Sequence, residues 1–390
     1  MPPDPIARLG VSVADVTPKT RWIFVDLETA AGVRGVGEAT LGGHEQAVID
    51  AVGHLVPAIF ALDDAGPDDL RRPELPGLPE AAAFSALDQA LWDVAARRRG
   101  VRLADALGDG GRDPVPVYAN INRRTLERTP AGFAASARDA LAAGHTAFKI
   151  APFDEATPEQ RRLGTLMQAV QPGLARIAAV REAIGADHRL MVDCHWRLDD
   201  AAATHVTHAA AELGVHWVEC PLPETDDQIT ALANLRRLAN RLGVLLAGCE
   251  LGICVDGFMP FLRAGAYDVM MPDVKYVGGM AEMLRLADHM QRAGVGFSPH
   301  NPSGPVCHAV SLQLSAAVGT LHSLETQFDE TPMFASLAGD AFPPATAGAM
   351  PLPADNGIGM TVAAGPLAAC RSAHWIATRD RPQLAPTAGN

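Results

Sequence analysis

Seven ionisable side chains stand at the ends of short apolar stretches of the chain. In order along the sequence they are Lys149, Asp193, Glu219, Glu250, Asp273, His300 and Glu325. If each stretch is a buried strand, its end carries a group that is costly to bury, because an unpaired charge in a protein interior costs several kcal/mol. Helix capping or a loop salt bridge explains one such residue, whereas seven in succession indicate a common functional centre.

Three carboxylates at the ends of neighbouring stretches, Asp193, Glu219 and Glu250, predict a metal site. Carboxylates are hard oxygen ligands that suit Mg²⁺, which keeps coordination positions open for a substrate. Zinc sites usually contain His or Cys, so a set made only of carboxylates disfavours Zn²⁺. The first stretch ends in Asn120 and Asn122 and lacks the His-x-His of barrel metallohydrolases, which argues against a hydrolase.

The next two strand ends predict a general base. Asp273 and His300 end neighbouring stretches, and a carboxylate bonded to an imidazole nitrogen fixes the tautomer and raises the basicity of the ring. The alternative for His300 is a turn position in a segment rich in Pro, Asn, Ser and Gly. His195 lies two residues after Asp193 and should leave the same strand end, either as a general acid for a departing hydroxyl or as a residue of the loop rim.

The hydrophobic pattern predicts a scaffold that brings these strand ends together. Eight β-rich runs alternate with Ala/Leu-rich helical stretches and lack the period-2 alternation of half-exposed strands. The runs are residues 115–121, 146–151, 189–194, 215–220, 244–249, 267–272, 295–300 and 321–326. This α/β pattern predicts a closed (β/α)8 barrel, in which reacting groups lie at the carboxyl ends of the strands. A doubly wound sheet would carry a Gly-rich phosphate loop after its first strand, and NINRRTLER (120–128) has none.

The parts of the chain outside the barrel predict a second, α+β unit. Residues 1–114 are expected to form a capping domain, residues 115–334 the barrel, and residues 335–390 a segment that packs back on the cap. In the capping domain the expected elements are strands at 11–16, 22–29 and GVRGVGEAT, and helices near 44–60 and 81–100. The last ten residues are expected to be frayed.

Composition narrows the classes of partner. The net charge of −13 argues against nucleic acid or an anionic membrane as a partner, because both require a basic surface. The sequence has no apolar run of membrane-spanning length and no apolar leader at its start. Its six cysteines lack CxxC spacing, which is typical of reduced, buried thiols. We therefore expect a cytoplasmic protein that acts on a small molecule.

Seven motifs together resemble one known family. They are FKIAPF, VDCH, WVECPLP, AGCELG, MMPDVKYVGG, SPHNPSGPV and SLETQ. The chain is similar over nearly its whole length to the mandelate racemase group of the enolase superfamily, whose members combine a barrel with a capping domain. The resemblance implies one Mg²⁺ per subunit on the three carboxylates, the Asp273–His300 pair as the base, and a homo-oligomer. It also implies that Lys149 binds a substrate carboxylate and that Glu325 donates a hydrogen bond to it as it becomes an enediolate.

Two departures from the family pattern favour dehydration. Members that racemise carry Lys-x-Lys where this chain has Lys149 and Ala151, so the second base is absent. Asp193-Cys194-His195 is similar to the Asp-x-His of galactonate, gluconate and mannonate dehydratases, in which the histidine protonates the departing hydroxyl. We therefore predict a lyase that dehydrates a sugar acid to a 2-keto-3-deoxy acid. The alternatives are a racemase, epimerase or cycloisomerase with Lys149 or His195 as second base, and a catalytically silent sugar-acid-binding protein.

Three further residues are candidates for substrate contacts. The chain has only three lysines, Lys19, Lys149 and Lys275, because nearly all of its basic residues are Arg. Each of these lysines is therefore a better functional candidate than a lysine usually is. Lys275 is expected either to contact the substrate or to pair with an acid such as Asp268. Asn122 and Asn301 are expected to bond sugar hydroxyls.

Overall fold

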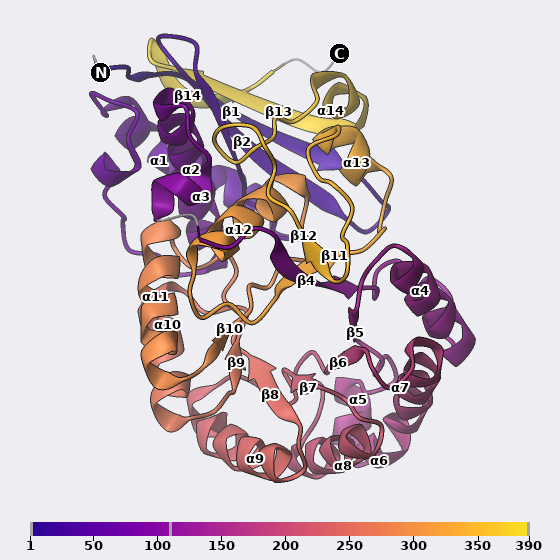
Figure 1. Ribbon diagram of the computed structural model, residues 1–390. Coiled ribbons are helices and arrows are strands. Elements are labelled where there is room, and N and C mark those ends of the chain that lie inside the picture. Colours follow the sequence, from indigo (N-terminus) through magenta and orange to yellow (C-terminus); the bar gives the residue numbers. More distant parts are fainter. Residues whose placement is uncertain (1–2, 109–110, 388–390) are drawn as a thin grey trace.

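The computed structural model describes residues 3–108 and 111–387 and contains two sheets (Figure 1). One sheet is antiparallel, with five strands in the order β14-β13-β1-β2-β3. Its strands are β1 (Ile6–Asp15), β2 (Arg21–Thr29), β3 (Arg34–Glu38), β13 (Arg371–Thr378) and β14 (Arg381–Pro386). Helices α1 (Glu45–Phe60) and α2 (Leu78–Arg99) pack on this sheet around an apolar core, and we call the whole unit the cap.

The cap draws on both ends of the chain. Strand β13 pairs antiparallel with β1 from Arg8 to Ala14, and β14 pairs in turn with β13. The expected fraying of the last ten residues is therefore wrong for residues 381–386. An open edge of β13 offers these residues backbone hydrogen-bonding partners, so they extend the sheet. Residues 388–390 lie outside the described part of the chain.

The second sheet is parallel and curls into a barrel. Its strand order is β10-β9-β8-β7-β6-β5-β4-β11, and an isolated parallel bridge connects Phe297 of β10 to Leu321, three residues before β11 begins. The strands are β4 (Val115–Asn120), β5 (Ala147–Ile150), β6 (Arg189–Asp193), β7 (Trp217–Glu219), β8 (Leu245–Gly248), β9 (Val269–Met270), β10 (Gly296–Phe297) and β11 (Leu324–Gln327). A short strand, β12 (Ala349–Met350), pairs antiparallel with β4. This architecture confirms the predicted barrel and its eight runs.

Helices surround the barrel as an outer layer (Figure 1). They are α4 (Pro130–Ala142), α5 (Pro158–Arg162), α6 (Leu166–Ala169), α7 (Gln171–Ile184), α8 (Asp200–Glu212), α9 (Ile229–Arg241), α10 (Cys254–Ala264), α11 (Met280–Ala293) and α12 (Pro305–Ala317). The other short helices are α3 (Leu103–Leu107), α13 (Met333–Ala338) and α14 (Ala364–Cys370). Within residues 3–108 and 111–387, no helix combines the length and apolar character needed to cross a membrane.

Side chains fill the inside of the barrel. Tyr118, Met191, Trp217 and Met271 belong to one buried cluster, in which the rings of Tyr118 and Trp217 meet edge to face with centroids 5.4 Å apart. Because the interior is packed, a ligand has access only at the ends of the strands. The ionisable residues therefore lie where a cavity can form.

Polar residues of α2 attach the cap to the loop that follows β9. Ser85 Oγ accepts a hydrogen bond from the backbone N of Gly278 at 3.1 Å, and Gln89 Nε2 donates to the carbonyl oxygen of Val274 at 3.1 Å. At the end of β3, the Glu38 carboxylate accepts from the backbone N of Gly304, at 2.8 Å, at the start of α12. The cap thus holds the two loops that carry Asp273 and His300.

The contact between β3 and α2 is too close for a side chain, which gives a test of this packing. A Cβ at Gly37 would lie 1.9 Å from the carbonyl oxygen of Ala86. We expect Gly37→Ala to lower the free energy of unfolding by about 1–3 kcal/mol through overpacking, as measured by urea denaturation. Gly365→Ala in α14 is the control, because nothing lies within 4 Å of that Cβ. Equal midpoints for Gly37→Ala and the wild type would contradict the packing.

Candidate active site

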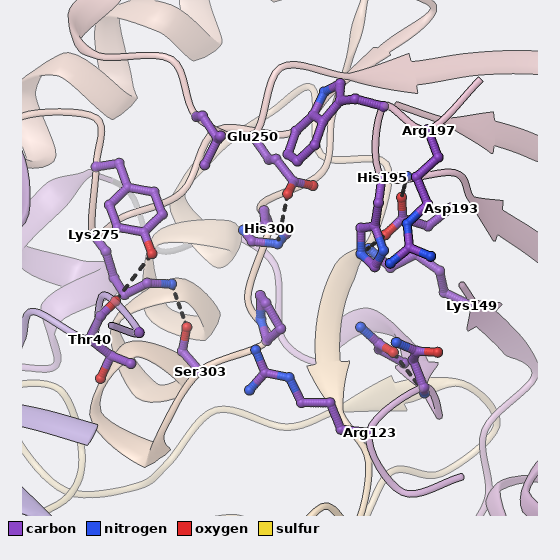
Figure 2. A pocket seen from close by; sticks show the side chains of 17 residues that line it. Thr40, Arg123, Lys149, Asp193, His195, Arg197, Glu250, Lys275, His300 and Ser303 are labelled. Carbon is purple, nitrogen blue, oxygen red and sulfur yellow. Dashed lines mark hydrogen bonds and ion pairs between the residues drawn. The ribbon is translucent and has the colours of Figure 1, made fainter. Parts of the chain in front are cut away.

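A cavity of about 490 Å³ opens at the carboxyl ends of the barrel strands (Figure 2). Predicted site residues that line it are Asn122, Lys149, Asp193, His195, Glu250, Lys275 and His300. Other predicted residues are buried behind its wall, namely Glu219, Asp273, Asn301 and Glu325. The structure therefore gathers the predicted residues at one place but divides them into a lining and a supporting layer.

The three predicted metal ligands lie on consecutive strand ends. Asp193 and Glu219 are paired in register between β6 and β7, and Glu250 follows the end of β8. Burial raises the pKa of Glu219 to about 8, a rise to which repulsion from Asp193 contributes and which Lys149 opposes. Burial also raises the pKa of Glu250, and the charge of Asp193 adds to the effect. The carboxylates thus lack enough positive charge around them, a deficit that a bound cation would relieve.

Each of these carboxylates is turned toward a basic side chain. Glu219 Oε1 lies 2.5 Å from Lys149 Nζ, Asp193 Oδ2 lies 2.9 Å from His195 Nε2, and Glu250 Oε1 lies 3.6 Å from His300 Nε2. For this reason no three His, Cys, Asp or Glu side chains among the described residues converge as around an ion. Their all-oxygen chemistry and their positions nevertheless fit Mg²⁺, once these side chains turn from the basic groups to a common centre.

Asp273 and His300 form the predicted hydrogen bond. Asp273 Oδ2 lies 2.8 Å from His300 Nδ1, which leaves Nε2 of the ring on the side of Glu250 and the cavity. Burial alone would lower the pKa of His300, but the carboxylates of Glu250 and Asp273 outweigh it and raise the pKa above its ordinary value. This geometry suits an imidazole that takes a proton at Nε2.

The backbone after β6 directs His195 into the cavity. His195 and Trp196 have φ values of 48° and 57°, in the left-handed region that non-glycine residues rarely adopt. The nearby Asp193 carboxylate outweighs burial and raises the pKa of His195 to about 9. Burial would raise the pKa of Asp193, but His195 and its hydrogen bond lower it to about 2. Asp193 thus favours the protonated form of the His195 ring, which lines the cavity.

Glu325 differs from the role that the resemblance implied. Its Oε1 accepts from Asn120 Nδ2 at 2.6 Å and lies 2.9 Å from Lys149 Nζ, and its Oε2 accepts from the backbone N of Asn301 at 2.9 Å. Burial raises the pKa of Glu325, but the Lys149 ammonium outweighs it and leaves the pKa below its ordinary value. Glu325 is thus an ionised acceptor in this arrangement. It cannot donate a hydrogen bond to a substrate unless Lys149 moves away.

Two of the weaker expectations need correction. The Asn301 side chain does not line the cavity, because its Nδ2 lies 3.0 Å from both the carbonyl oxygen of Glu325 and Nδ1 of His308. Asp268 is bonded to Arg236 at 2.7 Å, so it is not the partner of Lys275. The expected position of Asn122 at the cavity agrees with the structure, where its Oδ1 accepts from Arg128.

Several cavity residues escaped the sequence analysis. They are Thr40, Gly42, Arg123, Trp196, Arg197, Leu251, Tyr276, Pro302 and Ser303, with Asn120, which was noted only as a strand end. Thr40 and Gly42 come from the cap, and no spacing along the chain relates them to strand ends more than 70 residues away. The quoted motifs offered a usable signal for four of the others: SPHNPSGPV contains Pro302 and Ser303, MMPDVKYVGG contains Tyr276, and AGCELG contains Leu251.

A parallel barrel with carboxylates on successive strand ends and an antiparallel cap defines a protein of the enolase type. Comparison with protein families agrees: residues 4–108 match the mandelate racemase / muconate lactonizing enzyme N-terminal domain, and residues 132–365 match the enolase C-terminal domain-like family. The chain belongs to the mandelate racemase / muconate lactonizing enzyme family of the enolase superfamily.

Characterised relatives that it resembles are sugar-acid dehydratases. It is 32% identical over 287 residues to D-gluconate dehydratase of Thermoproteus tenax, a match that covers 72% of this chain and only 54% of that protein. It is 29% identical over 302 residues to D-galactonate dehydratase of Verminephrobacter eiseniae (strain EF01-2), covering 75% of each. The fold is similar to that of a putative dehydratase from Zymomonas mobilis ZM4, with a TM-score of 0.84 at 21% identity over 96% of this chain and all of that one.

Lys149 offers a test of the charge balance in this cluster. It is fully buried between Glu219 and Glu325, so Lys149→Met leaves both carboxylates without their cation. We expect the free energy of unfolding, measured in urea without divalent cations, to fall by about 3–5 kcal/mol. Lys19→Met is the matched control, because Lys19 is exposed and its loss should change stability by less than about 0.5 kcal/mol. Equal losses in the two variants would refute the buried charge cluster.

Proposed function

We propose that the protein is a Mg²⁺-dependent dehydratase of a sugar acid. The observation that carries the proposal is the pair of histidines in one cavity, each held by its own carboxylate. Asp273 bonds Nδ1 of His300 and leaves Nε2 for a proton, whereas His195 lines the same cavity with its Nε2 2.9 Å from Asp193 Oδ2. One histidine is thus arranged as a base and the other as an acid. The names of the relatives support the same reaction class.

The residues of the chain divide the reaction into two proton transfers. His300 Nε2 removes the proton from C2, beside the carboxylate, and the electron pair left on C2 forms an enediolate. His195 then gives its proton to the 3-hydroxyl as the C3–O bond breaks, so water leaves and an enol remains. The enol tautomerises to a 2-keto-3-deoxy acid. Asp273 keeps the proton on Nδ1 of His300 throughout, because its carboxylate is the acceptor of that hydrogen bond.

The metal and the buried Lys149 would balance the negative charge of the substrate. When bound by Asp193, Glu219 and Glu250, Mg²⁺ supplies Lewis-acid stabilisation of the negative charge that develops next to the carboxylate. Lys149 lines the cavity wall, where its ammonium would attract the carboxylate of the substrate.

Isomerisation on this scaffold remains the alternative, and the geometry disfavours it. A racemase needs a neutral base on the face of C2 opposite His300. The position that supplies a second lysine in racemising members is Ala151, and Lys149 is held between two carboxylates. His195 follows Asp193 in the Asp-x-His pattern that resembles the dehydratases, so it suits an acid for a leaving hydroxyl better than a second base.

A screen of acid sugars tests the proposal directly. Incubated with Mg²⁺ and a library of aldonic and aldaric acids, the protein is expected to convert at least one acid to a 2-keto acid, detected as its semicarbazone. Removal of the metal with EDTA should abolish the activity, and added Mg²⁺ should restore it. His300→Asn should lose at least about 1,000-fold in kcat, because the base is gone. Full activity with EDTA or in His300→Asn would refute this mechanism.

The role of His195 is tested separately in D2O. His195→Gln keeps the base, so it should still exchange the C2 proton of the substrate for deuterium. Loss of water should slow by about 100- to 1,000-fold, because the acid for the hydroxyl is missing. The two rates are measured on one sample by NMR and by 2-keto acid release. Deuterium gain with inverted configuration and no water loss in the wild type would favour the isomerase instead.

A further inference from the structure

The ammonium group of Lys275 is buried in the wall that supports the base. Its side chain is 3% exposed, and Nζ lies 2.6 Å from Asp273 Oδ2 and 2.5 Å from Ser303 Oγ. Nζ also lies 4.8 Å from the centre of the Tyr276 ring, a distance typical of a cation–π contact. Figure 2 shows Lys275 joined to Ser303 at one side of the cavity, beside the loop of His300.

These contacts use all the hydrogen-bonding capacity of the lysine. An ammonium has three N–H donors, and here a carboxylate, a hydroxyl and a ring face are available to them. The nearby Asp273 carboxylate keeps the pKa of Lys275 well above its ordinary value despite burial, so the group is charged. Lys275 also lines the cavity, as the substrate contact predicted from the sequence requires, but its two hydrogen bonds go to Asp273 and Ser303.

We propose that Lys275 is a positioning residue for the base, and that it acts through Asp273. One oxygen of Asp273, Oδ2, receives both Lys275 Nζ at 2.6 Å and His300 Nδ1 at 2.8 Å. The other, Oδ1, accepts from the backbone N of Lys275 at 2.8 Å. Asp273 is thus held on both oxygens and cannot rotate away from the imidazole. This inference rests on the proposed role of His300 as the base.

The charge of Lys275 has a second effect on Asp273. The Asp273 side chain is completely buried, and an isolated buried carboxylate tends to take up a proton. The adjacent ammonium outweighs this effect and, with His300, keeps the pKa of Asp273 below its ordinary value. A protonated Asp273 could donate to Nδ1 and would then place the imidazole proton on Nε2, the wrong nitrogen for a base. Lys275 therefore selects the tautomer of His300.

Lys275 also ties together the two loops that meet at the base. Asp273 and Lys275 follow β9, whereas Ser303 and His300 follow β10, and the Lys275–Ser303 contact bridges them. The cap reinforces both sides, since Gln89 bonds the carbonyl oxygen of Val274 and Glu38 bonds the backbone N of Gly304. Lys275 thus links the two loops that the cap holds to the Asp273–His300 pair.

A double-mutant cycle with Asp273 tests whether Lys275 acts through that residue. In the Mg²⁺-loaded enzyme, Lys275→Met is expected to lower kcat about 100-fold and to change KM by less than about threefold. In an Asp273→Asn background the same substitution should change kcat by less than about twofold, because the group it acts on is gone. A full effect in both backgrounds, or a rise in KM of more than tenfold with kcat retained, would overturn the proposal.

Further variants serve as controls for folding and for turnover. Lys275→Met leaves Asp273 without its cation, so its fold is checked by circular dichroism, and Lys275→Gln is made beside it because an amide can donate without the charge. Ser303→Ala is the matched control: it removes the other partner of Nζ but keeps the ion pair, so kcat should fall less than about tenfold. A loss in Ser303→Ala as large as that in Lys275→Met would assign the effect to the loop contact instead.

The tautomer of His300 is measured without turnover. In protein labelled with ¹⁵N-histidine, His300 is identified by comparison with His300→Asn and its resonances are recorded with the ring neutral. The wild type is expected to hold the proton on Nδ1, and Lys275→Met to show a mixture of tautomers. The same single tautomer in both proteins would refute the proposal. If no acid sugar is converted by the wild type, the proposed function fails while this comparison still decides the role of Lys275.

Discussion

The burial of negative charge at the mouth of the barrel is the constraint on which the rest of the site depends. Asp193, Glu219, Glu250, Asp273 and Glu325 are all nearly inaccessible to solvent. Desolvation disfavours every one of these ions, so each needs a nearby cation. Lys149 serves two of them, Lys275 and His300 serve Asp273, and His195 serves Asp193. The places of the basic residues follow from this demand, and so does the metal site that we propose.

The cap acts on this cluster of buried charges through hydrogen bonds to the loops that carry them. Gln89 connects the end of β3 to the loop after β9, since its Oε1 accepts from the backbone N of Glu38 and its Nε2 donates to Val274. Thr40 lines the cavity, and its carbonyl oxygen accepts from the hydroxyl of Tyr276. The cap therefore both shapes the cavity and fixes the loops beneath it, while the barrel supplies the ionisable groups of the site.

The sequence predicted the contacts that depend on the order of the regular strands. The Asp273–His300 hydrogen bond and the pairing of Asp193 with Glu219 depend on which strands are neighbours, and the order of runs along the chain determines that. Beyond the strand ends the prediction weakened, because loop geometry sets the direction of a side chain. Asn301 turns away from the cavity toward the carbonyl oxygen of Glu325 for this reason. Contacts from the cap, such as that of Thr40, depend on how two units dock and leave no trace in local spacing.

The pairing of β1 with β13 has a consequence for how the molecule is made. A ribosome makes β13 more than 350 residues after β1, with the entire barrel synthesised between them. Until then one long edge of the cap sheet has no neighbour, and such an edge invites pairing with other chains. The nascent cap therefore stays incomplete until β13 has been synthesised. Chaperones that shield exposed strands would act on it during that interval.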